Sequence, residues 1–173
     1  MPFIIAIIGI IVAGYFWAQR ARDMAEIAET VAEVPGDIKA AARRFGFKRR
    51  TNVHPVESVD DPKLAIAGIA NSFFELGALP TEEQRRMLML QVRSVLGVSY
   101  DEAEELLVLG RWLASESGGP EAGILRLSRR LNKIAGVDGF QNLMELLKNL
   151  LKDNWSDEQI TALNDIKRAF RIS

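Results

Sequence analysis

An apolar stretch at the N-terminus is the feature that most constrains what this chain can form. The segment Pro2–Gln19, PFIIAIIGIIVAGYFWAQ, has 18 residues and no side-chain charge. As a helix rising about 1.5 Å per residue it would be about 27 Å long, close to the thickness of a bilayer's hydrocarbon core. The run ends in aromatic residues, whose rings favour the headgroup layer. We therefore expect a single transmembrane helix here.

Two alternatives for this stretch stay open, a cleaved signal peptide and a buried core helix. A signal peptide would carry basic residues before the apolar run and a small-residue cleavage motif after it. The sequence has neither, which favours an uncleaved anchor. We assign to the anchor the large apolar and aromatic residues Phe3, Ile4, Ile5, Ile7, Ile8, Ile10, Ile11, Val12, Tyr15, Phe16 and Trp17.

Charge predicts the orientation of the anchor. No charged side chain precedes the apolar run, whereas Arg20 and Arg22 follow it directly. The first 50 residues carry eight Lys or Arg against five Asp or Glu, a net charge of +3, and the remainder carries a net charge of −4. By the positive-inside rule, the N-terminus lies outside and the body of the protein lies in the cytoplasm.

Composition excludes several kinds of site. The chain of 173 residues has no cysteine and one histidine, His54. Disulfides, thiolate catalysis and a cysteine or multi-histidine zinc centre are therefore excluded. The sequence also has no Gly-rich phosphate loop, nucleophile elbow or paired-carboxylate signature. We expect a non-enzymatic protein with no cofactor, in which His54 is an exposed loop residue.

The remaining sequence predicts an all-α protein in three parts. Residues 1–34 form the anchor and a helical stalk, and residues 35–60 form a short basic helix followed by a linker. Residues 61–173 form a bundle of six helices separated by Gly and Pro. Two of these helices meet at Gly136, where the glycine predicts a break. No segment alternates in the way that a strand would.

Three interpretations of the segment Arg43–Arg50, RRFGFKRR, stay open. The segment is either a solvated linker, a contact for anionic lipid headgroups, or a docking site for a protein or nucleic acid. An RNA-recognition motif needs a β-sheet, which the sequence does not predict, so we expect no nucleic acid as a partner. The residues proposed to contact lipid or a partner are Arg20, Arg22, Arg43, Arg44, Lys48, Arg49 and Arg50.

Two echoed stretches, LPTEEQRR at Leu79–Arg86 and NWSDEQIT at Asn154–Thr161, resemble helix starts. Each fits a capping box, in which a hydroxyl and a Gln or Glu three residues later bond each other's backbone N–H groups. Ser99 and Glu102 form a third example. Acidic residues in the first turn favour helix initiation further. Helix initiation therefore explains the similarity of the two stretches without a ligand site.

The same pattern resembles the TerB-like family, which includes tellurite-resistance TerB proteins and the N-terminal domain of membrane-anchored J-domain co-chaperones. The resemblance begins at Asp61 and rests on FFELGALPTEEQRRMLMLQVRSVLGVSYDEAEELL and LMELLKNLLKDNWSDEQITALNDIKRAF. It implies a helical bundle in which acidic turns are implicated in divalent-cation binding. In this chain Leu76 and Lys152 replace the expected acidic residues, which leaves only Glu75 and Asp153 as weak candidate ligands.

The sequence and the resemblance together lead to one functional expectation. The protein would be a single-pass component of the bacterial inner membrane that presents a TerB-like bundle to an unidentified protein partner in the cytoplasm. A membrane complex or an envelope-stress response would be its setting, and Trp155 is a candidate partner anchor. The alternative is a calcium-responsive TerB-like sensor linked to tellurite or stress resistance.

Overall fold

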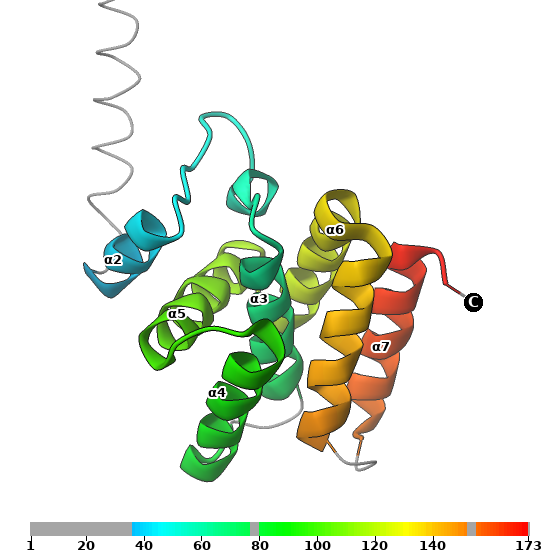
Figure 1. The fold of residues 1–173 in the computed structure, drawn as a ribbon. Helices are drawn as coiled ribbons and strands as arrows, with labels where there is room; N and C mark the ends of the chain where they lie inside the picture. Colours follow the sequence, from blue (N-terminus) through cyan, green and yellow to red (C-terminus); the bar gives the residue numbers. More distant parts are fainter. Residues whose placement is uncertain (1–35, 77–79, 152–154, 173) are drawn as a thin grey trace, which may run out of the picture. The chain divides into compact units, whose positions relative to one another are not determined.

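The computed structural model describes residues 36–76, 80–151 and 155–172. In these ranges the chain forms six α-helices and one short 3-10 helix, with no β-strand (Figure 1). The prediction of an all-α helical bundle is therefore confirmed. No helix among the described residues is both long and apolar enough to cross a membrane. The predicted anchor and stalk at 1–34 lie outside the described residues.

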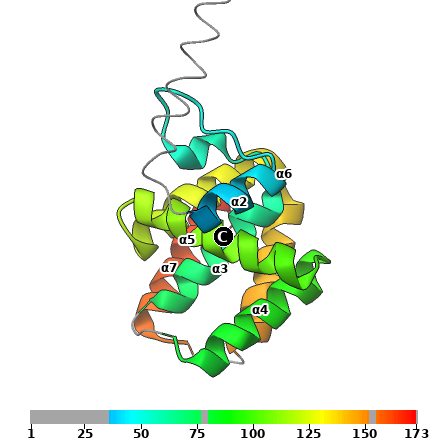
Figure 2. The same cartoon turned by 90° about the vertical axis from the view of Figure 1, so that its left-hand side faces the viewer.

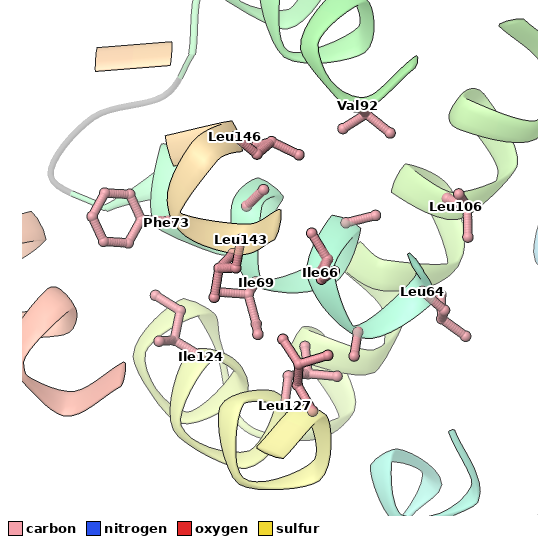
Figure 3. Packing of buried hydrophobic residues seen from close by; sticks show 14 of the residues in the cluster. Leu64, Ile66, Ile69, Phe73, Val92, Leu106, Ile124, Leu127, Leu143 and Leu146 are labelled. Carbon is pink, nitrogen blue, oxygen red and sulfur yellow. The ribbon is translucent and has the colours of Figure 1, made fainter. Parts of the chain in front are cut away.

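Helix α3 (Pro62–Glu75) is the centre of the bundle. Its start follows the sequence prediction, because the Asp61 carboxylate accepts a hydrogen bond from the Lys63 N–H at 2.8 Å and Pro62 takes the first helical position. Every residue from Leu64 to Phe73 is buried. Such a helix must be covered on all sides, and α5 (Tyr100–Glu116) and α6 (Pro120–Leu151) provide most of the cover. Figure 3 shows Ile66 and Ile69 among the leucines of α6.

Glycines allow α3 and α5 to approach at backbone distance. A Cβ added to Gly110 of α5 would lie 2.6 Å from the Cα of Gly68 in α3. A Cβ at Gly123 would lie 2.7 Å from that of Ala114, so the start of α6 meets α5 in the same way. Both separations are shorter than atoms tolerate, and the crossing therefore requires residues without side chains.

The other helices cover the outside of this centre. Helix α4 (Glu82–Leu96) packs on α5 and α6, α7 (Asp157–Phe170) packs on α6, and α2 (Gly36–Arg44) packs on α5. Each is amphipathic, and α4, for example, turns Leu88, Val92 and Leu96 inward.

The predicted break at Gly136 is present, because α6 (Pro120–Leu151) consists of two helical halves that meet at a kink at this residue. Helix α6 spans 32 residues, and Gly136 in its middle has φ 52° and ψ −134°. These angles are outside the helical region and are accessible to glycine. The helix resumes at once, which places Phe140 against Phe170 of α7 with ring centroids 5.2 Å apart. The prediction that two helices meet at Gly136 is therefore confirmed, although no loop separates them.

The bundle has two distinct ends (Figures 1 and 2). At one end lie the 3-10 helix η1 (Pro55–Ser58), the start of α3 and the kink of α6. At the other end the last turn of α3 meets the start of α7, where the Gln159 amide donates to the Phe73 carbonyl at 3.2 Å.

The segment expected to be a linker packs into the bundle. Residues Gly36–Ser173 form one compact unit, and Val56 and Val59 of the expected linker are fully buried. The sequence pattern did not indicate this, because a 3-10 helix of four residues is too short to show a period.

The close crossing of α3 and α5 generates a stability prediction. Gly110→Ala should lower the free energy of unfolding by about 1–3 kcal/mol, because the added methyl group forces the two backbones apart. Gly36→Ala is the control, since a Cβ at Gly36 meets nothing within 4 Å. Urea unfolding of both variants measures the effect. Equal stability of the two variants would show that the crossing tolerates a side chain.

Candidate functional site

The basic segment Arg43–Arg50 is held against the bundle by its own side chains. The ring of Phe47 lies edge-on to Trp112 of α5, with centroids 6.0 Å apart and planes at 81°. The Arg44 Nε lies 3.1 Å from the Glu105 carboxylate on the same helix. The Phe47 N–H donates to the Ala42 carbonyl at 2.8 Å, which turns the chain directly after α2. The segment is therefore an ordered part of the bundle.

A buried arginine fastens the next part of the chain. Arg130 of α6 is 7% exposed, and its Nε donates to the Val59 carbonyl. Its Nη2 donates to the Asp60 carboxylate at 2.6 Å, and the same carboxylate pairs with Arg50 at 3.2 Å. Burying a guanidinium is costly unless its donors are matched, and these contacts give partners to the Nε and to one terminal nitrogen. We call Val59, Asp60 and Arg130 the clasp.

His54 has a structural role that differs from the expectation of an exposed loop residue. It is half-buried, and its Nδ1 accepts from the Val56 N–H at 3.3 Å. Because Nδ1 accepts, the ring hydrogen is assigned to Nε2, which lies 3.0 Å from the Glu116 carbonyl at the end of α5. His54 thus caps η1 and α5 together. The expectation failed because Glu116 is 62 residues away in the sequence.

Three cations of the basic segment remain exposed. Arg43, Lys48 and Arg49 make no ion pair with any side chain in the described part of the chain. Arg44 and Arg50, by contrast, form ion pairs with Glu105 and Asp60. Arg20 and Arg22 lie outside the described residues.

The second predicted site, around Glu75 and Trp155, is also occupied by internal contacts. The Glu75 carboxylate lies 2.9 Å from the Arg111 Nε, and the same arginine donates to the Asn71 side chain at 3.4 Å. The Trp155 ring lies edge-on to Phe73, with centroids 5.5 Å apart. Trp155 is half-buried and keeps part of its surface in solvent. Lys152 and Asp153 lie outside the described residues.

The described residues bring no metal site together. Among them, no three His, Asp or Glu side chains are close enough to share an ion. A shallow hollow of about 300 Å³ between α6 and α7 is lined by four carboxylates. Glu121, Asp157 and Glu158 of this group lie in first helical turns, where the helix dipole favours acidic residues.

All three predicted capping boxes are present. The hydroxyls of Thr81, Ser99 and Ser156 accept from the N–H three residues on, and the Gln or Glu side chain accepts from the hydroxyl residue's N–H. In the first box, for example, the Thr81 N–H lies 2.8 Å from the Gln84 side-chain oxygen. This outcome confirms the prediction that the echoed stretches initiate helices.

Comparison of the chain with protein-family models, with curated proteins and with solved structures gives no match. The TerB-like resemblance therefore stays a prediction. Sequence reasoning also missed Arg130, whose partners lie about 70 residues earlier in the chain. The one signal in the sequence is an arginine on the apolar side of an amphipathic helix.

The clasp can be tested through Arg130. Arg130→Met removes the hydrogen bond to the Val59 carbonyl and should lower the free energy of unfolding by about 1.5–3 kcal/mol. The pair with Asp60 adds little to this value because that carboxylate is exposed to solvent. Arg129→Met, at an exposed neighbour, should change the free energy by less than about 0.5 kcal/mol. Similar losses in urea unfolding of the two variants would contradict the clasp.

The capping box of α5 predicts a pH effect. Hydrogen bonds from the Ser99 backbone and hydroxyl lower the pKa of Glu102 below its ordinary value of 4.5. A carboxylate with a lowered folded-state pKa stabilises the protein above the ordinary value and loses that contribution as the pH falls through the folded-state pKa. Glu102→Gln should therefore remove this acid-dependent loss of stability. Glu104→Gln lies outside the capping box and should leave this loss of stability unchanged. Unfolding titrations between neutral and acid pH measure the difference between the two variants.

Proposed function

We propose that this chain is a single-pass membrane protein that holds a TerB-like helical bundle in the cytoplasm as a non-enzymatic docking module for another protein. The observation that carries the proposal is the sequence order: an uncharged stretch of 18 residues, a basic segment, and a mildly acidic bundle. This order suits a protein whose bundle lies beside an anionic inner leaflet.

The use of polar side chains supports a docking role over catalysis. Three polar groups that could take part in chemistry or ligand binding have structural partners instead. His54 caps two helices, Glu75 pairs with Arg111, and Gln159 joins α7 to α3. An enzyme site normally brings such groups together around a cleft.

The calcium-responsive alternative receives less support. It depends on Glu75 and Asp153 as ligands, and the Glu75 carboxylate is engaged by a guanidinium 2.9 Å away. A calcium ion needs six or more oxygen ligands and would have to displace Arg111 from this carboxylate.

The membrane part of the proposal is tested by extraction. The full chain should stay in the membrane pellet after alkaline carbonate treatment, whereas the chain without residues 1–34 should move to the supernatant. This follows because an uncharged helix of this length has no favourable place outside the bilayer. Release of the full chain into the supernatant would contradict the anchor.

The docking part is tested by recovery of a partner. Affinity purification of the full chain from gently solubilised native membranes, followed by mass spectrometry, should recover a protein partner. Trp155→Ala should reduce that recovery, since the exposed part of a half-buried tryptophan is a typical interface anchor. Ile160→Ala, an exposed apolar residue on the next helix, is the matched control. Circular dichroism checks that both variants are folded, and unchanged recovery with Trp155→Ala would remove this residue from the interface.

A further inference from the structure

We infer that Arg43, Lys48 and Arg49 form a preformed contact surface for anionic lipid headgroups. We call these three residues the basic ridge. The inference deepens the proposed function and rests on it, because it takes residues 1–34 to be a membrane anchor. It names the lipid surface itself as a partner of the bundle.

The first argument is which cations are available. Of the five basic residues between Arg43 and Arg50, Arg44 pairs with Glu105 and Arg50 pairs with Asp60. The three members of the basic ridge are exposed and have no ion pair in the part of the chain that the structure describes. The charge of the ridge is therefore not offset by an ion pair with any of the described residues.

The second argument is that the ridge is fixed in place. Phe47 packs on Trp112, and the Arg50 N–H donates to the Ser58 hydroxyl at 3.0 Å. Lys48 and Arg49 lie between these two attachment points. The buried Ala41 shows which side of α2 faces the bundle, and Arg43, two residues later, is exposed. A surface that is ordered before binding loses less conformational entropy when it binds.

The third argument selects lipid over nucleic acid. Proteins that bind single-stranded RNA or DNA stack bases on exposed aromatic rings. The two aromatic residues of this segment, Phe45 and Phe47, are instead half-buried against the core. Only cations remain for a ligand, and an anionic bilayer surface needs nothing else. The ridge also lies on the C-terminal side of the predicted anchor and stalk, soon after them in the sequence.

The experiment uses the full chain in nanodiscs of phosphatidylcholine, with or without phosphatidylglycerol. Hydrogen exchange of the amides in residues 43–53 should be several-fold slower in the anionic discs. High salt should abolish this difference, because exposed charges are screened within a Debye length. The salt series on the unmodified chain tests the ridge even where a variant alters folding.

A charge-reversed variant and a matched control complete the test. Arg43→Glu/Lys48→Glu/Arg49→Glu should lose the lipid dependence, while α3 exchanges as in the unmodified chain. Arg86→Glu/Arg126→Glu/Arg129→Glu makes the same charge change at exposed arginines elsewhere and should retain the lipid dependence of exchange in residues 43–53.

Equal exchange in the two kinds of disc overturns the ridge but leaves the anchor standing. Failure to enter nanodiscs overturns the anchor and the ridge together. Protection by an RNA oligonucleotide in neutral discs, without protection by anionic lipid, would assign the ridge to nucleic acid instead.

Discussion

The contact between Gly68 and Gly110 sets the geometry on which the rest of the structure depends. Because α3 is buried along ten consecutive residues, it needs neighbours on every side, and the nearest of them can approach only where side chains are missing. The leucine-rich halves of α6 then fill the remaining space around Ile66 and Ile69 (Figure 3). The outer helices need only one apolar face each, since they cover an existing core.

Polar groups in this bundle mainly define where elements begin, end and join. The capping boxes satisfy N–H groups that a helix leaves unpaired at its start. In one of them Gln159 has a second contact with the end of α3, so that a local motif also fixes a tertiary joint. His54 joins two elements in the same way. These side chains therefore connect elements that are distant in the sequence.

Local signals in the sequence predicted most of the helices, and non-local contacts explain what it did not predict. Four helices begin at a residue whose side chain bonds a partner two or three residues later, and such pairs can be recognised in the sequence. The residues are Asp61, Thr81, Ser99 and Ser156. The packing of the expected linker depends on Arg130, about 70 residues distant, and no spacing rule connects them. The neutralisation of Glu75 by Arg111 is hidden for the same reason. For the candidate site, the sequence therefore supplied the charges, and only the fold showed which of them are already paired.

The clasp also determines how the domain would respond to a cut in its backbone. Residues Thr51, Asn52 and Val53 are exposed and offer a protease an accessible stretch between the basic ridge and η1. The chain on the N-terminal side of such a cut would still be held by Phe47 on Trp112 and by Arg44 on Glu105. The chain on the other side would be held by Val59 and Asp60 on Arg130. A nicked molecule would therefore keep its two fragments together, because each fragment has contacts of its own with the bundle.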